Sequence, residues 1–152
     1  MNAHHIFRFW DQETHPTTLS ALRSLTDEQL DWKPQGWHSS ARDLAVHMCN
    51  VEWVWIYRNA LRLESWDARW KSKEFRTWPE LLAYWEHVHA ASTDWLMNTP
   101  LSELDKQYAL PYDQSPRASL HWIVNHVIEH EIHHRGQLFM LMRMQGINPP
   151  EI

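Results

Sequence analysis

Cysteine and glycine are both scarce in this sequence of 152 residues, which has a single cysteine, Cys49, and three glycines. One cysteine cannot form an internal disulfide, so the class of small disulfide-rich domains is excluded and a reducing compartment is favoured. No apolar run approaches the ~18 residues of a membrane-spanning helix, and residues 1–10 lack the apolar core of a secretory signal. We therefore expect a cytoplasmic protein without a membrane span.

Clusters of lysine and arginine are also absent, and the formal net charge is −5. Nucleic-acid binding depends on basic side chains that neutralise phosphates, so this charge pattern disfavours a nucleic-acid partner. A small molecule is the partner that we expect instead.

Tryptophan, by contrast, is abundant, with eleven residues, and apolar residues make up 43% of the chain. Long runs of β-branched residues are missing, and this composition favours helices over a sheet. The length suits one domain with a proper core. The sequence therefore predicts a single all-α domain spanning residues 1–152.

Apolar residues recur at helical spacing in four long segments. Within the first segment, Pro16 predicts a kink or a division of the helix after His15. The Thr26–Gln29 segment resembles a capping box and predicts a short helical turn. Residues 99–116 contain three prolines and predict a loop. The four long helices are expected at residues 2–25, 40–63, 77–97 and 116–145.

The connector between the second and third helices, residues 64–76, is longer than an antiparallel helix hairpin requires. Fully extended it reaches about 40 Å, which is enough to run back along a 24-residue helix. We therefore predict a four-helix bundle of up-down-down-up order, with a long connector between helices two and three.

Four of the twelve histidines lie within residues 126–134 of the fourth helix. Residues four apart on a helix are neighbours, so His130 and His134 can reach one metal ion. We place both on the inward stripe of the helix, between Val127 and Leu138. His126 lies one turn earlier and is expected to line the site without ligating, whereas His133 is turned about 60° away from this row.

A third ligand must come from elsewhere, and His47 is the histidine on the apolar stripe of the second helix. If the second and fourth helices face each other, His47, His130 and His134 form a three-histidine site. Three ligands leave a coordination position open for water or substrate, as in catalytic sites. The alternative is that the three histidines are unrelated and each bonds to its own neighbours.

The residues His130–His134 also match the H-E-x-x-H signature of zinc metalloproteases, in which Glu131 would be the general base. Two observations count against this alternative: the usual downstream third ligand is missing, and the sequence after His134 does not continue like a zincin. Glu131 can instead form an i,i+4 ion pair with Arg135 on the outer face of the helix.

Three segments resemble the DinB/YfiT-like superfamily of metal-binding four-helix bundles. They are Trp32-Lys-Pro34 with Trp37-His-Ser39 ahead of the helix that carries His47, the run from His126 to Gln137, and the tail from Arg143 to Pro150. The resemblance implies the up-down-down-up bundle, a homodimer, and His47, His130 and His134 as the metal ligands. It also implies similarity to thiol-dependent enzymes, which use mycothiol or bacillithiol as S-transferases or as a maleylpyruvate isomerase.

We therefore expect one divalent metal ion, nickel or zinc before iron or manganese, since all four accept imidazole. The function that the sequence favours is a metal-dependent S-transferase or related enzyme acting with a low-molecular-weight thiol. No residue stands out as an independent acid or base, so whether the protein is an enzyme stays open. The alternatives are a metal-binding bundle without catalysis and a metallohydrolase that uses Glu131.

Overall fold

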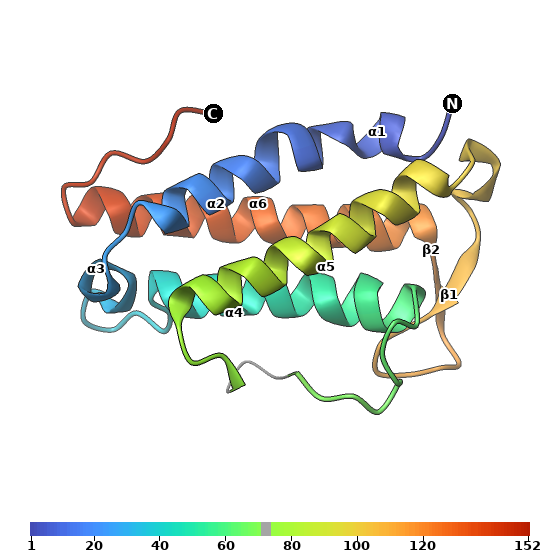
Figure 1. Cartoon of the computed structure of the whole chain (residues 1–152), viewed down its shortest axis with the longest axis horizontal. Helices are drawn as coiled ribbons and strands as arrows, with labels where there is room; N and C mark the ends of the chain where they lie inside the picture. Colours follow the sequence, from blue (N-terminus) through green and yellow to red (C-terminus); the bar gives the residue numbers. More distant parts are fainter. Residues whose placement is uncertain (71–73) are drawn as a thin grey trace.

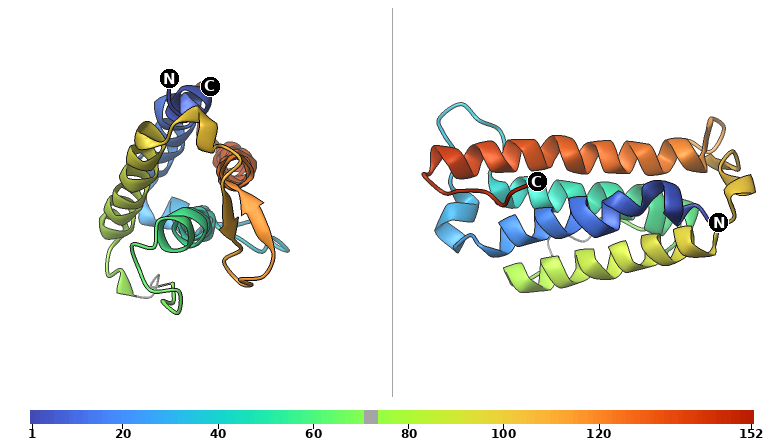
Figure 2. Two further views of the ribbon diagram at one scale, coloured as in Figure 1. Left: turned by 90° about the vertical axis from the view of Figure 1, so that its right-hand side faces the viewer. Right: turned by 90° about the horizontal axis from the view of Figure 1, so that it is seen from above.

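The computed structural model describes residues 1–70 and 74–152, in which four long helical rods pack side by side (Figure 1). Seen end-on, the rods surround a shared interior (Figure 2). The prediction of a mostly helical fold is confirmed. The rods are α1 (His4–Phe9) with η1 (Trp10–Thr14) and α2 (His15–Arg23), α4 (Ala41–Glu52) with η2 (Trp53–Ala60), α5 (Trp78–Asn98), and α6 (Leu120–Met144).

Capping boxes fix the start of three helices, and the one at Thr26 is predicted from the sequence. The hydroxyl groups of Thr26, Ser40 and Thr77 accept hydrogen bonds from the backbone N–H three residues later. They begin the short helix α3 (Asp27–Asp31), α4 and α5. Each box satisfies N–H groups that the first helical turn leaves without partners.

The irregularity in the first rod lies before His15, so the prediction of a division after His15 is wrong. The segment η1 is a π-helix that ends at Thr14, and α2 starts at His15 with Pro16 in its first turn. Proline is tolerated in a first turn because its missing N–H leaves no donor unpaired there. The wider π-helical turn precedes the proline, and the rod continues through it.

Residues 99–116 are not a simple loop, which corrects the expectation from their prolines. They contain the short 3-10 helix η4 (Leu101–Glu103) and the strand β1 (Gln107–Ala109). This strand pairs antiparallel with β2 (Arg117–Ser119), and the side chain of Asn59 donates a hydrogen bond of 2.7 Å to the carbonyl oxygen of Ala109. A backbone segment that pairs with another strand depends on tertiary contacts, which proline content does not reveal.

The order of the rods can be followed in Figure 1. Helices α4 and α5 begin at the end of the molecule where α3 lies, whereas α1 and α6 begin at the opposite end. The segment that was predicted as a connector runs between α4 and α5, and its residues 71–73 lie outside the described residues.

Within the part of the chain that the structure describes, no helix is both long and apolar enough to cross a membrane.

The buried stripe of α6 differs from the predicted one. Ile123, Val127 and Leu138 are buried as expected, but Glu131 occupies the inward position between them. His130 and His134 are only half-buried. The prediction that these histidines face the core is therefore wrong, because the stripe passes through Glu131 at spacing four from Val127.

Candidate metal centre

The structure brings His47, His130 and His134 together at the surface between α4 and α6. Each offers a ring nitrogen, and the three nitrogens lie within 4.8 Å of one another. His47 is exposed and the other two are half-buried, so solvent reaches the cluster. The ring centroids of His47 and His134 are 4.7 Å apart, and that of His130 is 5.8 Å from each of them. We call these three residues the histidine triad.

Hydrogen bonds orient two of the three imidazoles. Nδ1 of His134 donates to the Oε1 atom of Gln137 at 2.7 Å, and Nδ1 of His130 donates to the backbone carbonyl of His126 at 3.2 Å. A ring whose Nδ1–H is held in this way carries its lone pair on Nε2, which is the atom left for a metal. Histidines that ligate metals in proteins are typically held by such partners.

Two of the three imidazoles, those of His47 and His134, have a lowered pKa. Desolvation lowers the pKa of His47, and positive charge on His134 or His130 would lower it further. Desolvation lowers the pKa of His134 as well, although its hydrogen bond to Gln137 acts in the opposite direction. A metal competes with protons for imidazole, so a lowered pKa leaves these rings free to ligate at neutral pH.

A pocket of about 340 Å³ lies beside the triad. Gln137 lines it, and its side-chain amide also lies 3.4 Å from Nε2 of His133. The rest of the wall comes mainly from the segment before α4, namely Gly36, Trp37, His38 and Ser39, together with Leu44. Gln137 thus joins the triad to a space of the size that a small molecule occupies.

On the other side of the triad, aromatic rings continue along α6. His126 stacks on Trp122, with centroids 4.9 Å apart and planes 10° apart, and contacts the ring of His130 at 4.5 Å. His126 is not among the three residues whose ring nitrogens lie within 4.8 Å of one another. Desolvation lowers the pKa of His126, which therefore stays neutral beside the triad.

Glu131 has a different place from both of those that the sequence suggested. It is buried, with 3% of its surface exposed, and its carboxylate accepts hydrogen bonds from Nε1 of Trp10 at 2.7 Å and Nδ1 of His15 at 3.2 Å. The expected ion pair with Arg135 on the outer face is therefore wrong. The role of Glu131 as general base of a metallohydrolase is wrong as well, because its carboxylate is engaged in the core.

A second group of metal-binding residue types lies in the core and was not predicted from the sequence. His15, Glu52 and His89 are all buried, and they place one ligand atom each within 4.8 Å of one another. A signal was present in the sequence, because His89 falls on the inner side of its helix one turn after Trp85. Glu52 carried no comparable signal, since an isolated glutamate in a helix is usually exposed.

The only cysteine in the sequence, Cys49, is fully buried. Desolvation, with a smaller contribution from Glu52, raises the pKa of its thiol well above the ordinary value. A thiol that is buried and protonated is a poor nucleophile. Any thiol chemistry at the triad therefore needs a thiol from outside the chain.

The fold and the clustered histidines define a helical bundle that carries a candidate metal site on its surface. The chain belongs to the DinB family, whose sequence profile matches residues 1–152. This confirms the family that the sequence motifs suggested. No curated protein matches the chain significantly.

Two solved structures share the fold. A DinB-like protein from Bacillus cereus ATCC 10987 has a TM-score of 0.75 and 20% sequence identity, with 99% of this chain and 97% of that chain covered. A DinB-like protein from Bacillus subtilis, YjoA, has a TM-score of 0.66 and 18% identity, with 90% of this chain and 89% of that chain covered. At these identities the likeness concerns the fold.

Proposed function

We propose that this protein binds one divalent metal ion, nickel or zinc, through His47, His130 and His134, and uses it to activate a low-molecular-weight thiol or a water. The observation that supports this most is the pair of hydrogen bonds that hold Nδ1 of His130 and Nδ1 of His134. Each bond leaves the Nε2 lone pair of its ring free for a metal, and the three residues offer ring nitrogens within 4.8 Å of one another. Family membership supports the same proposal.

Each neighbour of the triad has a part in this proposal. A divalent ion bound by neutral imidazoles lowers the pKa of a coordinated water or thiol, which is the chemistry that the ion supplies. Gln137 fixes the ring of His134, and the pocket beside it receives the substrate. The position left open by three ligands faces solvent, because the triad lies at the surface.

The order of the long helices, the assembly and the location belong to the same proposal. The directions of α4 and α5 in Figure 1 support an up-down-down-up bundle. The homodimer and the cytoplasmic location stay predictions, the first from the family resemblance and the second from the sequence.

Metal binding should depend on pH in a way that follows from the lowered pKa values. The ordinary imidazole pKa is 6.5, and those of His47 and His134 lie below it. These two rings therefore stay neutral down to a lower pH than an ordinary imidazole does. We therefore expect the nickel or zinc affinity, measured by competition with a chelator, to change little above pH 6.5 and to fall below it. An affinity that falls steeply between pH 8 and pH 6.5 would contradict this.

The thiol part of the proposal can be tested with cobalt, whose visible d–d bands respond to the ligands. Adding a small thiol to the cobalt-loaded protein should produce a thiolate-to-metal charge-transfer band and shift the d–d bands. The matched control is the same addition to the His130→Ala variant, which should give neither change. A loaded wild-type protein that binds no thiol and shows no turnover with one would favour the second candidate, a metal-binding bundle without catalysis.

A further inference from the structure

Two sets of tryptophan, glutamate and histidine meet in the core with the same hydrogen bonds. In the first set, Glu52 of α4 accepts from Nε1 of Trp85 at 2.8 Å and from Nδ1 of His89 at 3.0 Å, both on α5. Each carboxylate oxygen thus has one donor. Glu52 is 1% exposed and His89 7% exposed, so the set is shielded from solvent.

The second set repeats this arrangement on the first rod and α6. Glu131 accepts from Nε1 of Trp10 through one carboxylate oxygen and from Nδ1 of His15 through the other. The two sets meet at their histidines, because the rings of His15 and His89 stack with centroids 3.7 Å apart and planes 18° apart. We call His15, Glu52, His89 and Glu131 the core quartet.

The two sets have different spacing in the sequence, and a π-helix brings their side chains into the same arrangement. His89 follows Trp85 by four positions in the α-helix α5, whereas His15 follows Trp10 by five positions. The π-helix η1 covers Trp10–Thr14 and absorbs the additional residue, so His15 also lies one turn beyond its tryptophan. A second π-helix, η2, begins directly after Glu52. Single π-helical turns occur frequently at functional sites.

Both histidines have a ring nitrogen without a partner. Nε2 of His15 and Nε2 of His89 are buried and make no hydrogen bond with the described residues. Buried polar atoms in proteins nearly always have a partner, so two such atoms on stacked rings indicate a ligand. Nδ1 of His15 faces Glu131, which is the arrangement that orients a histidine toward a metal through Nε2. Nδ1 of His89 lies 3.0 Å from Oε1 of Glu52, so an ion held between these two atoms would displace the proton that they share.

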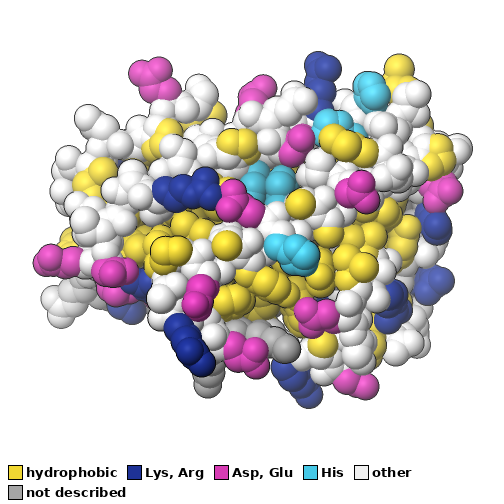
Figure 3. All heavy atoms as spheres, in the orientation of Figure 1, with side chains coloured by type: hydrophobic (Ala, Val, Ile, Leu, Met, Phe, Trp, Pro, Cys, Tyr) yellow, Lys and Arg dark blue, Asp and Glu magenta, His cyan; other side chains and the backbone are white. Residues whose placement is uncertain are grey.

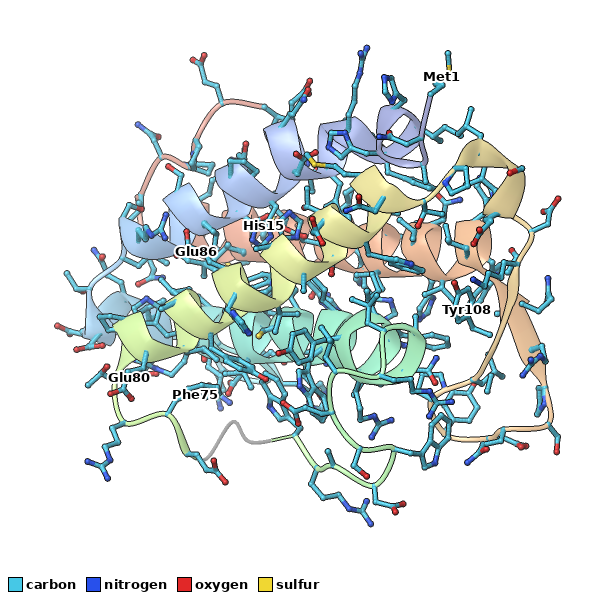
Figure 4. All side chains as sticks on the ribbon, turned by 45° about the vertical axis from the view of Figure 1, so that its right-hand side comes forward. Met1, His15, Phe75, Glu80, Glu86 and Tyr108 are labelled. Carbon is cyan, nitrogen blue, oxygen red and sulfur yellow. The ribbon has the colours of Figure 1, made fainter. Side chains whose placement is uncertain are left out.

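A pocket of about 470 Å³ leads to this cluster from outside, and His15, Leu19 and His89 line it. In Figure 3 histidine side chains reach the surface between α2 and α5. Figure 4 labels His15, which points between α2 and α5 toward α6, and Glu86 farther out on α5. Glu86 forms an ion pair of 2.7 Å with Arg23, also at this pocket. The two residues whose Nε2 atoms lack a partner therefore form part of the wall of a pocket.

We propose that His15, His89 and Glu52 bind a second divalent cation in the core, with Glu131 orienting His15. Their ligand atoms lie within 4.8 Å of one another, and zinc or cobalt would draw them closer, since metal–ligand bonds are about 2.0–2.2 Å long. One divalent ion balances the two buried carboxylates when both imidazoles are neutral. Imidazole and carboxylate together suit zinc, cobalt, iron or manganese.

This site is independent of the histidine triad, because α4 and α6 supply different residues to each. The test therefore starts from a His47→Ala/His130→Ala variant, which lacks the triad. Titration of this variant with Co²⁺ and with Zn²⁺ is expected to show one tightly bound ion per chain. Adding His15→Gln and His89→Gln should weaken this binding by at least about 100-fold, because glutamine keeps an N–H for the carboxylate but removes the imidazole.

The matched control is His87→Gln, an exposed histidine on the same helix as His89, which should leave the second ion in place. Circular dichroism verifies that each variant is folded. X-ray absorption of the zinc-loaded triad-free variant needs no core substitution, and it should show two imidazole nitrogens and carboxylate oxygen around the ion.

Three results would overturn the proposal: a triad-free variant that takes up neither ion, uptake that survives the glutamine substitutions, or histidine NMR signals that show both core imidazoles doubly protonated in metal-treated protein. The last would identify the core quartet as two imidazolium–carboxylate pairs. The number of bound ions distinguishes this failure from failure of the proposed function. If the triad binds no metal, wild type and the triad-free variant would bind the same number of ions.

Discussion

Replacing His130 with alanine should abolish binding of nickel or zinc at the surface of the bundle. The change removes one of three ligands and leaves His47 and His134, which cannot enclose an ion by themselves. Loss of a residue that merely orients a ligand costs about 10–100-fold in affinity, so loss of a ligand should cost more than about 100-fold. Chelator competition measures the affinity, and elemental analysis of purified protein should show the occupancy fall by one ion per chain.

Two further variants allow the loss of affinity in His130→Ala to be compared with the losses expected when residues other than the ligands are replaced. His133→Ala removes an exposed imidazole that is not part of the triad but lies 3.4 Å from the amide of Gln137, so we expect a much smaller loss of affinity than for His130→Ala. Gln137→Ala keeps every ligand but removes the acceptor that holds Nδ1 of His134, so we expect a loss of about 10–100-fold. Equal affinity in wild type and His130→Ala, or an effect of His133→Ala as large as that of His130→Ala, would show that the triad is not the metal site.

Replacing Glu52 with alanine should destabilise the protein more than any surface change. The substitution leaves Nε1 of Trp85 and Nδ1 of His89 without an acceptor in the core. Breaking a buried charged pair by removing one partner costs about 3–5 kcal/mol, because the remaining groups stay desolvated and unpaired. Urea denaturation with a chelator present measures the free energy of unfolding without a contribution from bound metal.

The matched control for Glu52→Ala is Glu86→Ala, which breaks the ion pair with Arg23. Both side chains of that pair are about half exposed, and surface ion pairs contribute only about 0–1 kcal/mol. A loss for Glu52→Ala no larger than that of the control would mean that the tryptophan and histidine find other partners. The hydrogen bonds around Glu52 would then contribute little to stability.

The closeness of His130 and His134 is the part of the histidine triad that local sequence patterns predict. Spacing four places His130 and His134 together on any helix, so the geometry of a single element was enough for this pair. His47 joins them only if α4 packs beside α6, and that depended on the assumption that the helices face each other. The burial of His130 and His134 was predicted wrongly. Both these histidines and Glu131 follow the helical spacing of the buried apolar residues of α6, so spacing alone did not show that Glu131 is the buried residue.

The core quartet shows where sequence patterns fail. A buried glutamate cannot be told from an exposed one by its position in a helix, since both are compatible with helical periodicity. The donors to Glu131 are Trp10 and His15, more than a hundred positions away along the chain. In addition, Arg135 lies four positions after Glu131 and offered a nearby ion-pair partner. The sequence therefore provided no reason to look for partners far away along the chain.

The sequence by itself determined the helices, their capping boxes, the pairing of His130 with His134 and the family, since each depends on neighbours within a few positions or on short motifs. Tertiary structure alone decided which face of α6 is buried, that residues 107–109 form a strand, and that two glutamates meet two histidines in the core. The physical reason is that burial and long-range hydrogen bonds depend on which surfaces pack together, and several packings are compatible with the same periodicity.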